Sequence, residues 1–180
     1  SVANVSPRDL NASTPLTIGE NQPVGALVGS ITATDGDEWA VLTYSLIQGD
    51  GNGSSGLFEI NSTSGELRTR VTFDYENNAS DYPIQIRVTD ERNASVDGNF
   101  TIVLLDLNEK PYDLSAGDAL KVRENLPEGT IVGSFSAKDP DGDSLVYSLL
   151  LENNESLPLA MDRNGTLRTT RSRSEEHTSE

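Results

Sequence analysis

Four short acidic motifs are the part of this 180-residue sequence best suited to chemistry. They are Glu20, Asp74-Tyr75-Glu76, the segment Asp106-Leu107-Asn108-Glu109-Lys110-Pro111, and Asp139-Pro140-Asp141. Calcium prefers carboxylate and amide oxygens, in sets of about six to eight at roughly 2.3–2.6 Å. Each motif also has a simpler explanation, because Asp-Pro-Asp-Gly at 139–142 is often only a turn and a lone glutamate is usually solvated. The motifs therefore predict calcium only where several of them act together.

The overall charge agrees with cation binding. Aspartate and glutamate number 29 against 13 lysines and arginines, which gives a net charge of −16. This surplus repels nucleic-acid phosphates and anionic membrane surfaces, so we expect neither as a partner. Acidity for solubility alone is the other explanation, and the placement of the carboxylates has to distinguish the two.

Catalysis finds little support in the residues. The chain has no cysteine, its single histidine is His177, and no Gly-x-Ser-x-Gly nucleophile motif occurs. An EF-hand is also excluded, because counting from Asp139 places Ser144 and Leu150 where that loop needs glycine and glutamate. We therefore expect no enzymatic activity.

The sequence repeats itself at an offset near 104 residues. Glu20-Asn21 recurs as Glu124-Asn125, Val28-Gly29-Ser30 as Val132-Gly133-Ser134, and Asp35 and Asp37 as Asp139 and Asp141. Later matches, such as Gly65 to Thr69 with Gly165 to Thr169, have an offset of 100. The falling offset indicates short deletions in loops, where they are tolerated.

Within one repeat the pattern is that of β-strands. Apolar and polar residues alternate with a period of two from Tyr82 to Val88 and again from Phe100 to Leu104. Turn residues such as Thr63-Ser64-Gly65 separate the runs. We predict an all-β fold of tandem antiparallel Greek-key β-sandwiches, the second of them truncated.

The repeat also sets the expected domain boundaries. Residues 1–6 are a linker remnant, 7–108 a complete domain and 109–172 an incomplete one that lacks two strands. Residues 173–180, Arg173-Ser-Glu-Glu-His-Thr-Ser-Glu180, match nothing in the repeat and look like a translated sequencing adapter. A genuine polar tail is the alternative.

The four acidic motifs, in this order and with the repeat, resemble those of the cadherin repeat family over about residues 7–170. The resemblance implies a cadherin-like or immunoglobulin-like sandwich and up to three calcium ions that stiffen the junction between domains. It implies Glu20, Asp74, Glu76, Asp106, Asn108, Glu109, Asp139 and Asp141 as ligands, with Lys110 giving its main-chain carbonyl. The family pattern Asn-Asp-Asn reads Asn108-Glu109-Lys110 here, so two ions and three ions both stay open.

A second, weaker site is implied upstream. Asp35, Asp37 and Asp90 would serve a junction with a preceding domain. There Val2 and Val5 stand where Asp106 and Glu109 stand in the later linker. We therefore expect this upstream junction to bind calcium weakly or not at all.

The expected function is a calcium-binding extracellular adhesion and structural module, contacting other cadherin-like repeats or cell-surface proteins. No apolar run reaches the roughly 20 residues of a membrane helix, so any anchor would belong to a parent protein. Nine of fourteen asparagines lie in Asn-x-Ser/Thr sequons, which favours a secreted or cell-surface glycoprotein, although Asn-Gly and Asn-Ser turns create sequons incidentally. The alternative function is a spacer repeat in a secreted bacterial enzyme or carbohydrate-binding protein.

Overall fold

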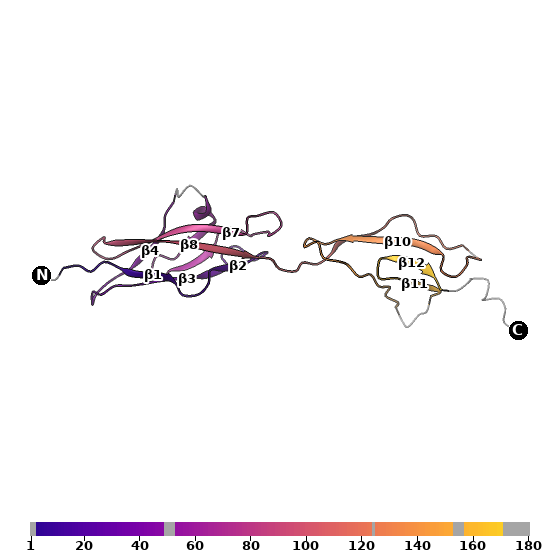
Figure 1. Cartoon of the computed structure of the whole chain (residues 1–180), viewed down its shortest axis with the longest axis horizontal. Coiled ribbons are helices and arrows are strands. Elements are labelled where there is room, and N and C mark those ends of the chain that lie inside the picture. Colours follow the sequence, from indigo (N-terminus) through magenta and orange to yellow (C-terminus); the bar gives the residue numbers. More distant parts are fainter. Residues whose placement is uncertain (1–2, 49–52, 124, 153–156, 171–180) are drawn as a thin grey trace. The chain divides into compact units, whose positions relative to one another are not determined.

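The computed structural model describes residues 3–48, 53–123, 125–152 and 157–170 (Figure 1). The chain divides into two compact units, residues 1–107 and 108–180, which we call unit 1 and unit 2. Residues 171–180, which include the predicted adapter segment and His177, lie outside the described residues, as does Val2.

Unit 1 consists of two four-stranded sheets. One has the order β1-β3-β6-β5 and the other the order β2-β8-β7-β4. The strands are β1 (Arg8–Ala12), β2 (Thr17–Gly19), β3 (Leu27–Thr34), β4 (Thr43–Leu46), β5 (Phe58–Ile60), β6 (Glu66–Thr69), β7 (Asp81–Thr89) and β8 (Ser95–Leu105), with a 3-10 helix η1 at Ser54–Leu57. All pairs are antiparallel except β2 with β8, where Thr17 is opposite Val103. The predicted all-β sandwich is confirmed, with one parallel pair that the alternation pattern did not reveal.

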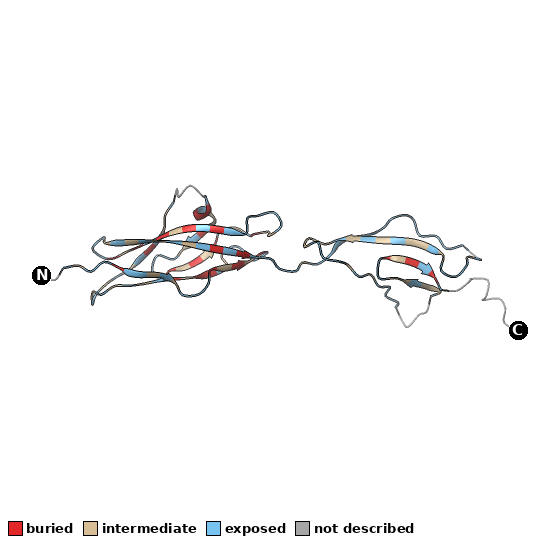
Figure 2. Ribbon diagram, in the orientation of Figure 1, coloured by how far each residue is buried: buried red, intermediate tan, exposed pale blue. Residues whose placement is uncertain are grey.

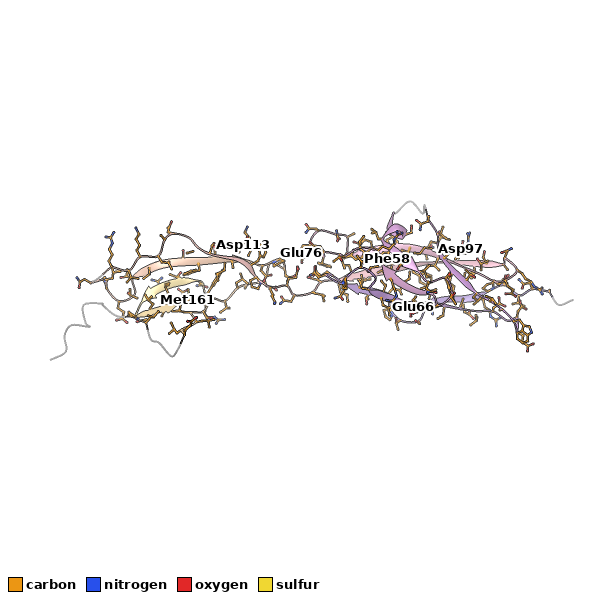
Figure 3. All side chains as sticks on the ribbon, turned by 180° about the vertical axis from the view of Figure 1, so that it is seen from behind. Phe58, Glu66, Glu76, Asp97, Asp113 and Met161 are labelled. Atoms are coloured by element: carbon orange, nitrogen blue, oxygen red, sulfur yellow. The ribbon has the colours of Figure 1, made fainter. Side chains whose placement is uncertain are left out.

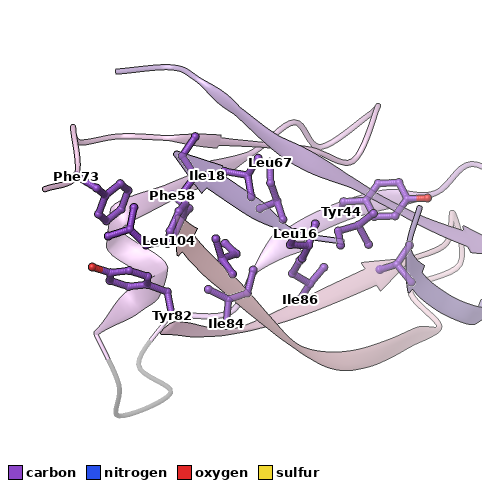
Figure 4. Close-up of a cluster of buried hydrophobic side chains, with 14 residues drawn as sticks. Leu16, Ile18, Tyr44, Phe58, Leu67, Phe73, Tyr82, Ile84, Ile86 and Leu104 are labelled. Carbon is purple, nitrogen blue, oxygen red and sulfur yellow. The ribbon is translucent and has the colours of Figure 1, made fainter. Parts of the chain in front are cut away.

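The period-two pattern of β7 is also confirmed. Tyr82, Ile84, Ile86 and Val88 are buried, whereas the residues between them are exposed or half-buried (Figure 2). They meet buried residues from the other sheet, such as Ile31 and Leu67, to form one core (Figure 4). Burial of these side chains between the sheets supplies the main driving force for folding of unit 1.

Three aromatic rings close one end of this core. Phe73 stacks on Phe58 with ring centroids 5.6 Å apart, and Tyr82 lies 5.0 Å from Phe73 and 5.9 Å from Phe58 (Figure 4). Such aromatic pairs contribute about 0.5–1.5 kcal/mol each beyond the area they bury. Because Phe73 directly precedes Asp74-Tyr75-Glu76, the cluster anchors the chain where that acidic motif begins.

Unit 2 contains one four-stranded sheet in the order β11-β12-β10-β9. Its strands are β9 (Tyr112–Ala116), β10 (Ile131–Lys138), β11 (Leu159–Met161) and β12 (Thr166–Thr169). Gly133 pairs with Leu167 as Gly29 pairs with Leu67 in unit 1. The internal repeat is therefore a repeat of strand register as well as of sequence.

One predicted equivalence is not seen as a strand. Leu145 to Leu149 matches the sequence of β4, yet these residues have no strand assignment, whereas β4 pairs with β7 over Thr43 to Leu46. No counterpart of β7 occurs among the described strands of unit 2, and a strand needs a partner for its backbone groups. Unit 2 has an open apolar groove of about 430 Å³. The residues that line it include Leu114, Phe135 and Met161.

The turn before β6 depends on glycine. Gly65 has φ +77°, and a Cβ there would lie 2.2 Å from the carbonyl oxygen of Ile31. Gly65 also accepts a hydrogen bond from the Ile31 N–H at 2.9 Å, and Gly165 accepts one from Phe135 in the same way at 2.8 Å. Glycine is needed in both repeats for two reasons. Its backbone has the left-handed conformation, and the neighbouring strand is too close to leave room for a side chain.

We expect Gly65→Ala to lower the free energy of unfolding of unit 1 by about 2 kcal/mol or more, because the new methyl group meets backbone that has to move. Denaturant unfolding followed by circular dichroism measures the change. Gly56→Ala is the matched control, since a Cβ at Gly56 has no atom within 4 Å. Equal stability of the two variants would contradict this role for Gly65.

Candidate metal centre

Glu20 is a fully buried carboxylate at the end of β2, with 0% of its surface exposed. Its Oε1 accepts a hydrogen bond from the Leu107 N–H at 2.8 Å, and its Oε2 accepts one from the Tyr75 N–H at 2.8 Å. Charge-assisted bonds of this kind compensate the cost of removing a carboxylate from water. Glu20 is therefore a structural clamp between two segments that each carry another acidic residue.

Those two acidic residues are Glu76 and Asp106. Together with Glu20, each offers a carboxylate oxygen within 4.8 Å of the others. Glu76, labelled in Figure 3, directly follows the clamped Tyr75 in the sequence. Asp106 directly precedes the clamped Leu107, so the backbone bonds to Glu20 set the spacing of all three. Three like charges at this distance repel one another, and a divalent cation would relieve the repulsion.

Asp74 accepts hydrogen bonds within its own loop. Its Oδ2 accepts a hydrogen bond from the Asn77 side chain at 2.7 Å, and its Oδ1 accepts one from the Glu76 N–H at 3.1 Å. The bond from Asn77 is the main cause that lowers the pKa of Asp74. Its carboxylate is not part of the Glu20–Glu76–Asp106 cluster, so its role as a ligand stays a prediction.

A second cluster lies at the opposite end of the strands of unit 1. Asp35 follows β3, Asp90 follows β7, and these two and Asp37 each offer an oxygen within 4.8 Å of the others. Asn4 donates from Nδ2 to Asp90 Oδ2 at 2.8 Å, and the Val5 N–H donates to Asp37 Oδ2 at 3.0 Å. The N-terminal segment thus binds to the cluster through an amide and a backbone group.

Asp90 is only 5% exposed, and this burial alone would raise its pKa. Hydrogen bonds from Asn4, from the N–H groups of Arg92 and Ala94, and the charge of Arg92 outweigh it, so the pKa of Asp90 is lowered. Asp90 therefore stabilises the fold while it is ionised. This contribution is present above pH about 4 and is lost as the pH falls through the lowered pKa.

Three buried oxygen atoms point to an additional ligand. Asn4 Oδ1, Asp35 Oδ2 and Asp141 Oδ1 are removed from solvent and accept no hydrogen bond from the residues that the structure describes. Buried oxygens are normally hydrogen-bonded or bound to an ion. Carboxylate and amide oxygens are hard donors, so the residues present fit a calcium ion.

Unit 2 has an acidic cluster of its own after β10. Asp139, Asp141 and Asp143 each offer an oxygen within 4.8 Å of the others. Asp139 Oδ1 accepts hydrogen bonds from the N–H groups of Asp141 at 2.9 Å and Asp143 at 3.3 Å. Asp143 was not among the predicted ligands, although its spacing of two from Asp141 is the spacing that joins Asp139 and Asp141.

The linker residue before each cluster is held in the same way. The Glu109 N–H donates to Asp141 Oδ2 at 2.6 Å, as the Val5 N–H donates to Asp37 Oδ2. In both units the second aspartate also donates its N–H to the first, from Asp37 to Asp35 and from Asp141 to Asp139. Asn108 is exposed and Glu109 half-buried in unit 2.

The family model described as "Cadherin domain" matches residues 14–105 of this chain. The chain is a member of the cadherin family. This match covers more than half of the chain and contains the strands β2 to β8 and the Glu20 clamp residue, so the predicted resemblance is confirmed.

Curated cadherins from several animals are similar to the chain. Human Protocadherin-16 is 39% identical over 142 residues, which is 74% of this chain and 4% of that protein. Protein dachsous of Drosophila melanogaster is 34% identical over 71% of the chain and 4% of its own length. Human Cadherin-17 is 31% identical over 74% of the chain and 18% of its own length. The chain thus spans less than a fifth of each of these cadherins.

Solved cadherin structures share the fold. The crystal structure of human Protocadherin-24 EC1-2 has a TM-score of 0.66 at 22% identity and covers 98% of this chain and 82% of that one. Drosophila N-cadherin EC1-4 has a TM-score of 0.67 at 24% identity, over 97% of this chain and 42% of that one. No helix among the described residues has the length and apolar content of a membrane span.

We expect Asn4→Ala to raise the pKa of Asp90, because the variant removes the first of the causes that lower it. Titration of the Asp90 carboxyl group by NMR, in the presence of a chelator, measures the shift. Asn61→Ala is the control, since Asn61 bonds to its own turn at Thr63 and Ser64. An unchanged Asp90 titration in Asn4→Ala would show that the Asn4 bond does not form in solution.

Proposed function

We propose that this chain is a calcium-binding extracellular adhesion module of a longer cadherin. The observation that carries the proposal is the Glu20–Glu76–Asp106 cluster, in which a buried carboxylate positions two others within 4.8 Å. A buried carboxylate that holds further carboxylates close together creates electrostatic repulsion, and a cation bound there would remove it.

The proposed calcium ligands are Glu20, Asp74, Glu76, Asp106, Asn108, Glu109, Asp139 and Asp141, with Asp143 added on its distance to Asp139 and Asp141. Calcium held by residues on either side of the linker 106–111 would stiffen that linker, with two or three ions. The Asp35–Asp37–Asp90 cluster is a second proposed site, supported by the buried oxygens of Asp35 and Asn4.

The second site should bind calcium more weakly than the first. It has three carboxylates and the Asn4 amide, and Val5 stands at the position that the proposed ligand Glu109 has in the later linker. Fewer negative ligands lower calcium affinity in oxygen-ligand sites. We place both in the range of extracellular modules, on the order of 10⁻⁴–10⁻³ M or somewhat tighter.

The proposed partners are cadherin repeats on the same or another cell surface, by analogy with the protocadherins to which the chain is similar. An extracellular location and the absence of enzymatic activity belong to the same proposal. The spacer function in a bacterial protein has no specific observation in its favour, since the relatives described above are animal cadherins.

We expect calcium at about 100 times its dissociation constant to stabilise unit 1 by about 2.7 kcal/mol, which corresponds to a rise of roughly 10 °C or more in melting temperature. Differential scanning calorimetry with calcium and with chelator measures the effect, and magnesium at equal concentration tests selectivity. The same melting temperature with calcium and with chelator would contradict the proposed function.

Asp106→Asn tests the site itself. We expect roughly half or less of the calcium-dependent rise in this variant, because one negative ligand is lost from the cluster. Asp81→Asn is the matched control, since Asp81 is an exposed aspartate at the start of β7 and outside the acidic clusters. A full calcium response in Asp106→Asn would place the ion elsewhere.

A further inference from the structure

The nine Asn-x-Ser/Thr sequons differ in how the fold presents their side chains. In unit 1 the asparagines of five of them are exposed, and the asparagine of a sixth, Asn4, is half-buried. The exposed five are Asn11, Asn61, Asn78, Asn93 and Asn99. Asn52 and Asn154 lie outside the described residues, and Asn164 is exposed in unit 2. A glycan requires an amide nitrogen that faces solvent, so the structure separates the sequons into two kinds.

Asn99 has the most defined position. It lies in the middle of β8 on the outward face, since Ile102 and Leu104 are buried and the strand alternates. Its sequon threonine, Thr101, is two residues further on, so both side chains lie on the same exposed face. Strand geometry thus presents the acceptor amide and the sequon hydroxyl together.

The surface around Asn99 is polar. Gln85 is its register partner on β7, and Arg87 and Asp97 form the next pair on the same face toward the hairpin turn. Arg87 Nε donates to Asp97 Oδ1 at 2.7 Å and Nη2 donates to Asp97 Oδ2 at 3.0 Å, so this pair is satisfied on the surface. On this side a hydrated sugar on Asn99 would cover polar groups that already have partners or solvent, whereas exposed Pro83 and Val103 lie on the other side.

Two other exposed sequons are next to the same hairpin. Asn78 precedes β7, and Asn93 lies in the turn between β7 and β8, with φ +67°. The β7–β8 hairpin therefore has an exposed sequon before its first strand, at its turn and within its second strand.

Asn4 has the opposite environment. Its Nδ2, the atom that a sugar would occupy, lies 2.8 Å from Asp90 Oδ2, and its Oδ1 is buried. A glycan there would place a bulky group at a half-buried amide against a carboxylate that is 5% exposed. The folded unit is incompatible with this unless the Asn4–Asp90 contact is given up.

We propose that Asn78, Asn93 and Asn99 carry N-linked glycans, of which the glycan on Asn99 covers the outer face of the β7–β8 hairpin, and that Asn4 is unmodified. In the transfer, the asparagine amide nitrogen forms a bond to the anomeric carbon of an oligosaccharide carried on a lipid diphosphate. The bond from that carbon to phosphate oxygen breaks, the lipid diphosphate leaves, and the amide nitrogen loses one proton. The inference rests on the extracellular location proposed above, and it removes this sheet face from the surfaces open to a protein partner.

Secretion of the full chain from mammalian cells tests the proposal. Peptide N-glycosidase treatment in heavy-oxygen water converts each glycosylated asparagine into a labelled aspartate, and peptide mass spectrometry locates the label. We expect label at Asn78, Asn93 and Asn99 and none at Asn4. An unlabelled Asn99, or a labelled Asn4, would overturn the proposal.

Thr101→Ala and Thr101→Ser form a matched pair, because Thr101 is exposed and opposite Pro83 on the same face. Thr101→Ala removes the sequon hydroxyl and should lose the mass of one glycan, whereas Thr101→Ser should keep it. Equal glycan mass in the two variants would overturn the assignment of Asn99. Calcium-dependent melting of the enzymatically deglycosylated chain is measured separately, so that a failure of the glycan proposal is distinguished from a failure of calcium binding.

Discussion

The arrangement of the first acidic site depends on one buried carboxylate. Glu20 has no exposed surface, and each of its two oxygens accepts a backbone hydrogen bond, from Tyr75 and from Leu107. Leaving a buried charge without such bonds would cost several kcal/mol, so the two N–H groups are a condition for its burial. Because Glu76 and Asp106 are the sequence neighbours of these two donors, their carboxylates come near Glu20 as a consequence of the fold. Backbone hydrogen bonds therefore determine the positions of the acidic cluster. The core supports it through Phe73, which directly precedes Asp74 in the sequence and packs on Phe58 and Tyr82.

Some carboxylate oxygens of the acidic clusters take part in hydrogen bonds of the fold, and others do not. Backbone N–H groups donate hydrogen bonds to both oxygens of Glu20 and to Oδ1 of Asp74 in unit 1, and to Oδ1 of Asp139 in unit 2. By contrast, Asp35 Oδ2 and Asp141 Oδ1 are buried oxygens without a hydrogen bond from the described residues. A carboxylate has lone pairs enough to accept a backbone bond and bind a cation, so the two roles are compatible. A bound cation would add charge compensation, since the hydrogen bonds fix positions but leave the like charges close together.

Much of the fold follows from local sequence patterns. The alternation from Tyr82 to Val88 predicts a strand with one buried face, and the glycine at the Thr63-Ser64-Gly65 turn has the left-handed backbone that such a turn needs. The pattern of Leu145 to Leu149 does not become a strand, because strand formation depends on a partner that no local pattern contains. The motif Asp74-Tyr75-Glu76 does not predict the hydrogen bonds that its carboxylates make: the Asp74 oxygens bond to Asn77 and to Glu76 N–H within their own loop, and Asp74 as a ligand stays a prediction. Short polar side chains compete for nearby backbone groups, and this competition is decided by loop conformation that the motif does not specify.

The two linker attachments show where the repeats differ. Val5 and Glu109 donate their N–H groups to equivalent aspartates, Asp37 and Asp141, although one side chain is apolar and the other is a carboxylate. The backbone bond forms with either side chain, so the repeat geometry is preserved while the charge beside it changes. With Glu109 as a proposed ligand, substitution at this single position would alter the number of cation ligands without altering how the linker begins its domain. If the acidic clusters bind calcium as proposed, successive junctions within one fold would differ in calcium affinity, and hence in stiffness, through side chains alone.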